Sequence, residues 1–100
     1  MYVTPNEDDR LRVFLAAELA RRVLQRGAKL NAPEATALVC DEMHLAARSG
    51  ATYEEVIEAG LQAVTLASLM DGVTDLVEEI RLEVLLDEGT RLVVLRKPWG

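Results

Sequence analysis

The sequence contains few of the side chains on which most enzyme and metal chemistry depends. Its 100 residues include one histidine, one cysteine and one tryptophan. Protein sites for zinc and similar metals generally take three or four donor side chains, so no three-histidine or four-cysteine site can form within one chain. A single cysteine also excludes an intramolecular disulfide. That cysteine count fits a reducing cytoplasm, and we expect a cytoplasmic location.

Long hydrophobic runs are also missing. Apolar runs are only a few residues long, whereas a membrane-spanning helix needs about 20. Residues Met1–Pro5 lack the basic segment and apolar stretch that open a signal peptide. The net charge is -6, and a surface of this sign repels phosphate backbones and anionic lipids. The sequence therefore predicts that neither nucleic acid nor membrane is a partner.

The composition is that of one folded domain. Half of the residues are hydrophobic and 28% are charged, which is typical of globular proteins. A chain of this length is too short for two independent cores. We expect residues 1–100 to form a single domain.

Capping signals predict three main helices. Thr4-Pro5-Asn6-Glu7, Asn31-Ala32-Pro33-Glu34 and Thr52-Tyr53-Glu54-Glu55 each place a capping side chain three residues before a glutamate. The first helix is expected from about Pro5 to Gln25 and the second is expected to reach about Arg48. The third starts after Thr52 and carries an apolar stripe to Val64. A short helical turn, capped by Thr65, is expected to run through Met70.

The hydrophobic period then changes from 3.6 to 2. Apolar side chains alternate from Ile80 to Leu86, Asp87-Glu88-Gly89 is a turn signal, and residues Arg91 to Leu95 form a second strand. The predicted fold class is α+β, with three main helices, a short helical turn and a C-terminal two-stranded antiparallel β-hairpin.

Two elements carry more apolar surface than one small core needs. On the first helix, apolar side chains such as Leu15, Leu19 and Val23 cover an arc of roughly 200°. Both faces of the hairpin are apolar. One set comprises Leu82, Val84, Leu92 and Val94, and the other comprises Leu85, Val93 and Leu95. We expect one set to pack on the helices, and the set with Val93 and Leu95 to meet another chain.

Cys40 and His44 are the main candidates for chemistry, because a spacing of four puts both on one face of the second helix. They offer two metal ligands with Asp41 or Glu42 nearby, or a thiol nucleophile and its base. No third orienting residue is visible, and a buried thiol beside a surface histidine is the favoured interpretation. Lys29 and Lys97 are expected in a loop and a tail, and no metal-ligand set can be argued from them. The sequence therefore predicts no catalytic residue, no cofactor-binding residue and no metal ligand in this chain.

The remaining candidates have structural interpretations too. The pairs Glu54-Glu55 and Glu78-Glu79 are adjacent in sequence, so the two side chains of each pair point in different directions and are expected to be solvated. Trp99 is expected either to anchor an interface, where aromatic residues are enriched, or to lie in a disordered tail.

The order of these motifs resembles the urease gamma-subunit family. The resemblance is carried by Thr4-Pro5-x-Glu7, Gly27-x-Lys29-Leu30-Asn31-x-Pro33-Glu34-Ala35, Arg48-x-Gly50, Met70-x-Gly72-Val73 and Asp87-x-Gly89-Thr90. It implies a non-catalytic structural subunit of a urease, which hydrolyses urea to ammonia and carbon dioxide. It also implies alpha and beta partner subunits, with a dinuclear nickel centre in the alpha subunit.

Some residues depart from the family pattern. Tyr2, Thr74 and the tail from Arg96 to Gly100 stand where the family usually has other residues. The alternative function is therefore a divergent relative that self-associates as a homo-oligomer, or binds another partner, without urease activity. A small free-standing enzyme that uses Cys40 and His44 is a third hypothesis.

Overall fold

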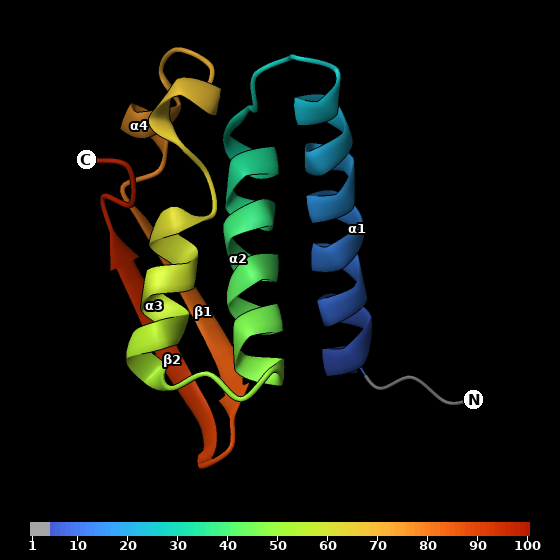
Figure 1. The fold of residues 1–100 in the computed structure, drawn as a ribbon, viewed down its shortest axis with the longest axis vertical. Helices are drawn as coiled ribbons and strands as arrows, with labels where there is room; N and C mark the ends of the chain where they lie inside the picture. The colour runs from blue at the N-terminus through green and yellow to red at the C-terminus, as the bar shows by residue number, and fades with distance from the viewer. Residues whose placement is uncertain (1–4) are drawn as a thin grey trace.

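A computed structural model describes residues 5–100 and confirms the predicted α+β fold (Figure 1). Apart from the short helix Val73–Leu76, its elements follow the order expected from the sequence. They are α1 (Pro5–Gln25), α2 (Ala32–Arg48), α3 (Tyr53–Gln62), the 3-10 helix η1 (Leu66–Ser68), α4 (Val73–Leu76), β1 (Glu79–Leu86) and β2 (Gly89–Arg96). None of the helices in this part of the chain combines the length and apolar character needed to cross a bilayer.

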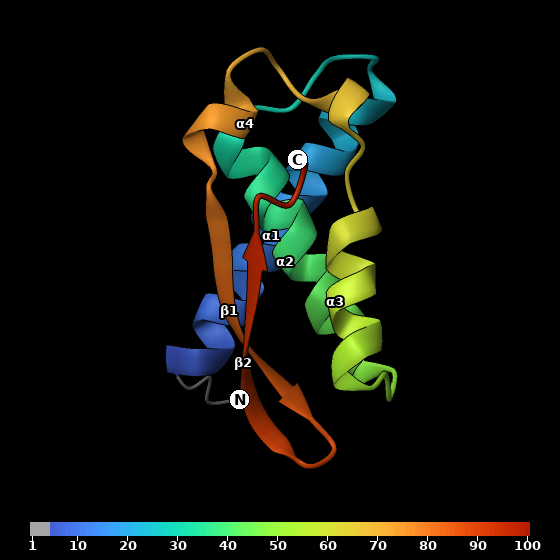
Figure 2. The ribbon, with the colours of Figure 1, turned by 90° about the vertical axis from the view of Figure 1, so that its left-hand side faces the viewer.

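Helix α2 lies at the centre of the arrangement. Helix α1 packs along one side of α2, and α3 and β1 pack on the other side. Figure 2 looks through the layers from the hairpin side. The hairpin and α3 lie next to each other in front, and α1 lies beyond α2. Helix α1 is therefore an outer layer, and only one of its sides is used by the core.

Capping boxes begin α2 and α3 as predicted. The Asn31 side chain accepts the backbone N–H of Glu34, and Glu34 in turn accepts the backbone N–H of Asn31, each at 2.9 Å. Thr52 and Glu55 repeat this exchange at 3.2 and 2.9 Å. Each box satisfies two donors that a helix start would otherwise leave open. The capping box predicted at Thr4 lies outside the described residues.

The segment between α3 and the hairpin contains more structure than the sequence predicts. The turn after Thr65 forms as η1, but Thr65 makes no side-chain cap to the backbone. The short helix α4 was not predicted. It is preceded by Gly72 at the N-cap position, whose φ of 87° lies in the left-handed region that favours glycine. A parallel bridge joins Leu30 to Leu69, which ties the α1–α2 loop to the residues after η1.

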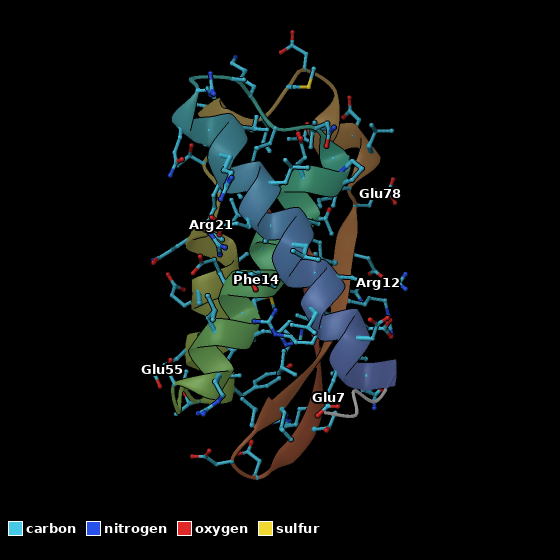
Figure 3. All side chains as sticks on the ribbon, turned by 90° about the vertical axis from the view of Figure 1, so that its right-hand side faces the viewer. Glu7, Arg12, Phe14, Arg21, Glu55 and Glu78 are labelled. Atoms are coloured by element: carbon cyan, nitrogen blue, oxygen red, sulfur yellow. The ribbon has the colours of Figure 1, made fainter. Side chains whose placement is uncertain are left out.

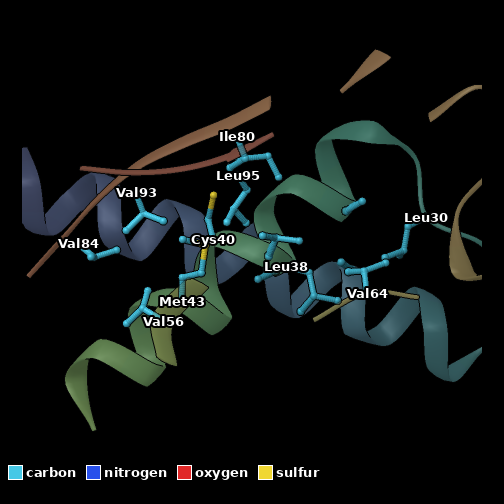
Figure 4. Packing of buried hydrophobic residues seen from close by; sticks show 14 of the residues in the cluster. Leu30, Leu38, Cys40, Met43, Val56, Val64, Ile80, Val84, Val93 and Leu95 are labelled. Carbon is cyan, nitrogen blue, oxygen red and sulfur yellow. The ribbon is translucent and has the colours of Figure 1, made fainter. Parts of the chain in front are cut away.

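The core lies on both sides of α2. Ala17 and Ala20 let α1 approach α2 closely, because both are fully buried and have small side chains. On the other side Met43 of α2 meets residues of α3 and the hairpin. Figure 4 shows these buried side chains converging: Val56, Val84, Val93, Leu95, Ile80 and Cys40.

The hairpin register corrects the faces expected from the sequence. Leu86 pairs with Gly89 around a two-residue turn, so each even-numbered residue of β1 pairs with an odd-numbered residue of β2. Paired residues share a face. The face that packs on the helices therefore carries Ile80, Leu82, Val84 and Leu86 with Val93 and Leu95. The expectation that Val93 and Leu95 meet another chain was wrong, because they are 0% and 2% exposed.

Gly60 is the point where α3 comes closest to its neighbours. A Cβ added there would lie 2.7 Å from Met43 Sδ and 2.8 Å from Leu95 Cδ1. Both neighbours are buried and have little room to move, so we expect Gly60→Ala to destabilise the fold by about 1–2 kcal/mol despite alanine's better helix propensity. Thermal denaturation measures the loss. Ala59→Gly, on the same helix, is the control for propensity alone, and a Gly60→Ala variant more stable than the parent would contradict this packing.

Candidate functional site

Cys40 and His44 lie on α2, but the structure does not assemble a reactive site around them. Cys40 is buried, and burial together with the nearby charge of Asp41 raises the pKa of its thiol to about 11. His44 is half-buried, and burial, with a contribution from Arg10, lowers the pKa of its imidazole. The thiol is therefore protonated and the imidazole neutral near pH 7. A protonated thiol is a poor nucleophile.

The state of Cys40 leads to a direct prediction. With a pKa of about 11, only about a thousandth of the thiol is ionised at pH 8. We expect the native chain to react with a disulfide reagent at least about a hundredfold more slowly than the chain unfolded in guanidinium. Absorbance of the released thiol reports the rate, and Cys40→Ser gives the background. Rapid stoichiometric labelling of the native chain would restore the nucleophile hypothesis.

The carboxylates expected beside Cys40 and His44 are directed elsewhere. Asp41 and Glu42 both bind arginine side chains of α1. Within residues 5–100, no three histidine, cysteine, aspartate or glutamate side chains gather into a group that could hold a metal ion. The donor set of the described residues therefore does not fit a nickel site.

The paired glutamates serve local roles. Glu55 is the glutamate of the α3 capping box, and its hydrogen bonds with Thr52 lower the pKa of its carboxyl. Glu54 is solvent-exposed. The carboxylate of Glu79 lies 3.4 Å from Arg81, and the backbone carbonyl of Glu78 accepts the Lys97 N–H at 2.7 Å. These positions agree with the solvated arrangement expected from the sequence.

A buried ionic cluster between α1 and α2 was not predicted. Asp41 is fully buried, and its two carboxylate oxygens lie 2.7 Å from Arg10 Nη1 and 2.6 Å from Arg21 Nη2. Arg21 also contacts Glu42 at 2.8 Å and Glu18 at 3.3 Å. Burial alone would lower the pKa of Arg21, but these hydrogen bonds raise it above the ordinary value. We call Arg10, Arg21, Asp41 and Glu42 the Arg–Asp cluster.

The cluster explains how α1 is aligned on α2. Arg10 and Arg21 are eleven residues apart, about three turns, so both side chains leave the same side of α1. Their guanidinium groups reach the Asp41 carboxylate from opposite directions along α1. A signal was present in the sequence, because Asp41 stands three residues after Leu38 and four before Leu45, within an apolar stripe of α2. Such a carboxylate is expected to need a charged partner.

The outer side of α1 carries the apolar surplus predicted from the sequence. Leu11, Leu15 and Leu19 follow one another at intervals of four residues, and Leu15 is 65% exposed. We call these three residues the α1 row. Phe14 is exposed beside it. Figure 3 shows α1 as the layer nearest the viewer, with Phe14 and Arg12 labelled on it.

The hairpin has a second apolar face that the described residues 5–100 leave open. Leu85 is 71% exposed, Leu92 is 45% exposed, and Val94 is half-buried. By the register, these residues alternate with the buried ones and lie on the opposite side of the ribbon. We call Leu85, Leu92 and Val94 the outer hairpin face. The predicted second apolar set therefore exists, with a different membership.

Trp99 is partly buried and packs against the edge of the core, which does not fit the disordered-tail alternative. It lines a cavity of about 230 Å³ with Val77, Glu78 and Lys97. Its indole N–H is buried and has no hydrogen-bond partner within residues 5–100.

Comparison with known proteins extends over nearly the whole chain. Residues 1–99 match the family model described as "Urease, gamma subunit". Two similar relatives are the urease subunit gamma of Saccharopolyspora erythraea and that of Ruegeria sp. (strain TM1040). Each is 42% identical over 98 residues, which cover 98% of this chain and 98% of the relative.

Proposed function

Since this chain belongs to the urease gamma-subunit family, we propose that it is a non-catalytic structural subunit of a cytoplasmic urease and packs with alpha and beta subunits. The observation that carries this function is the full-length match to the family and to its urease subunit relatives. The complex hydrolyses urea and water to two molecules of ammonia and one of carbon dioxide. The chain contributes to it as one domain spanning residues 1–100.

The proposal places the nickel centre in the alpha subunit and no catalytic, cofactor-binding or metal-binding residue in this chain. The chemistry of the donor set supports this division. Cys40 is held as a thiol, and Asp41 and Glu42 are engaged by arginine. A nickel ligand must instead present a lone pair that is free of a proton or a competing partner. The reaction at the metal therefore belongs to another chain of the complex.

The exposed apolar side chains support a role in assembly. Isolated exposed leucines are ordinary on protein surfaces, but Leu85, Leu92 and Val94 share one face of a two-stranded ribbon. Covering such a face removes apolar area from water and stabilises an interface. We assign the outer hairpin face to a partner subunit of the urease.

Co-purification tests this function. The other urease subunits are expressed with and without this chain, which carries an affinity tag free of histidine. Ammonia release and nickel content are measured in each sample. We expect the isolated chain to show neither turnover nor stoichiometric nickel, and to be recovered in a complex that shows both. Failure to associate with any urease subunit, or tight nickel binding by the isolated chain, would refute the assignment.

A surface variant tests the assigned face. Leu85→Asp places a charge on the outer hairpin face and should weaken association by at least about tenfold while leaving the isolated chain folded. Ala28→Asp, an exposed position in the α1–α2 loop, is the matched control for an added charge. Equal recovery of complex with both variants would exclude the outer hairpin face as the contact.

A further inference from the structure

The α1 row is symmetric about Leu15. Leu11 and Leu19 stand four residues before and after it, and all three are exposed. At 100° per residue, Leu11 and Leu19 lie about 40° to either side of the direction of Leu15. This direction points away from Ala17 and Ala20, which α1 buries against α2. The row therefore faces outward along the middle of the outer layer.

The two ends of the row carry charges at equal distances from Leu15, and these charges have opposite signs. Asp8 stands seven residues before Leu15 and Arg22 seven residues after it, and both are exposed; Asp8 also pairs with Arg12 of its own helix at 2.9 Å. Asp8 and Arg22 each lie about 20° from the direction of Leu15. An antiparallel copy of α1 centred on Leu15 would thus place Leu15 opposite Leu15 of the second copy. Leu11 of each copy would lie opposite Leu19 of the other, and Asp8 opposite Arg22. A surface that matches itself when reversed is what a twofold interface requires.

We propose that the chain forms a twofold-symmetric homodimer in which the α1 row packs against the same row of a second copy, with the two helices nearly antiparallel. We choose a second copy of this chain as the partner because the surface is complementary to itself. A parallel copy would oppose Asp8 to Asp8 and Arg22 to Arg22, which disfavours that orientation. The inference goes beyond the proposed role in urease and does not depend on it.

The contact is small, so the dimer is weak and reversible. Helix α1 has 21 residues and is about 31 Å long. One pair of helices buries less than the roughly 1,600 Å² of a standard protein interface. We therefore expect the purified chain to be monomeric when dilute and dimeric at high micromolar concentration in sedimentation experiments.

A cysteine at the twofold axis gives a geometric test. Two helices packed about 9–10 Å apart, with Cα radii of about 2.3 Å, bring facing Cα atoms to about 5 Å, which is within the range of a disulfide. Leu15→Cys should therefore form an intermolecular disulfide rapidly on mild oxidation. Leu85→Cys, equally exposed on the hairpin, should form it far more slowly, and the parent chain controls for buried Cys40.

Charge variants test the antiparallel orientation. Arg22→Glu opposes two carboxylates at each end of the interface and should weaken the dimer about tenfold, because the twofold axis repeats the contact. Adding Asp8→Arg should restore the affinity. Leu15→Glu should abolish the dimer while the circular dichroism spectrum stays that of the parent.

A chain that remains monomeric at millimolar concentration, with no preferred cross-link at Leu15→Cys, would overturn the dimer. Loss of urease assembly in Leu15→Glu, in a chain that never dimerises, would also overturn it and assign the row to a larger subunit. An intact urease with no dimer leaves the proposed function standing. A chain that dimerises but never joins a urease leaves the dimer standing and refutes the proposed function. The two failures are therefore distinguishable.

Discussion

Val93→Asp is expected to abolish cooperative folding of the isolated chain. Val93 is 0% exposed and pairs with Leu82 on the face that packs against the helices. An unpaired carboxylate there would have to be buried without a partner, at a cost of several kcal/mol. A domain of this size has a total stability of only about 5–15 kcal/mol. Far-ultraviolet circular dichroism and thermal denaturation should show a chain without a sharp unfolding transition.

Leu92→Asp is the matched control one residue away. Leu92 belongs to the outer hairpin face and is 45% exposed, so its carboxylate can remain hydrated. We expect an unfolding free energy within about 1 kcal/mol of the parent and a nearly unchanged spectrum. A folded Val93→Asp variant together with an unfolded Leu92→Asp variant would mean that the two hairpin faces are reversed.

The second large effect is expected at the Arg–Asp cluster. Asp41→Asn keeps the shape of the side chain but removes the charge that Arg10 and Arg21 share. Removing one partner from a buried ion pair typically costs about 3–5 kcal/mol, because the remaining charge stays poorly solvated. Both arginines are partly exposed, so the lower end of that range is expected here. For a domain of about 100 residues, 3 kcal/mol corresponds to a fall in Tm of roughly 12–24 °C.

Two further variants separate the possible causes. Glu42→Gln removes a carboxylate of the same cluster that is 40% exposed, and should cost less than about 1 kcal/mol. The triple variant Arg10→Met, Arg21→Met, Asp41→Leu removes buried Asp41 together with its two partly exposed arginines and should recover much of the loss. If Asp41→Asn melts at the same temperature as Glu42→Gln, the Arg–Asp cluster does not stabilise the packing of α1 on α2.

Local chemistry in the sequence determined most of the secondary structure. The capping boxes at Asn31 and Thr52 predicted the starts of α2 and α3, because a capping box needs only residues three positions apart. The change from a helical to a two-residue period predicted the hairpin for the same reason. Helix α4 escaped prediction because it has four residues and no side-chain cap. The apolar surplus on the first helix and on the hairpin likewise predicted surfaces for other chains without any tertiary information.

Pairings between distant residues were decided only by the tertiary structure. Alternation showed that the hairpin has two apolar faces, but the pairing of Leu82 with Val93 depends on the length of the turn, and packing on α2 and α3 selects which face is buried. Asp41 could be recognised as an unusual residue in an apolar stripe. Its partners, Arg10 and Arg21, lie 31 and 20 positions away, and only the packing of α1 on α2 brings them within hydrogen-bonding distance. Sequence periodicity specifies how each element is patterned, whereas contacts between elements depend on how their surfaces fit together, and that fit is a property of the folded chain.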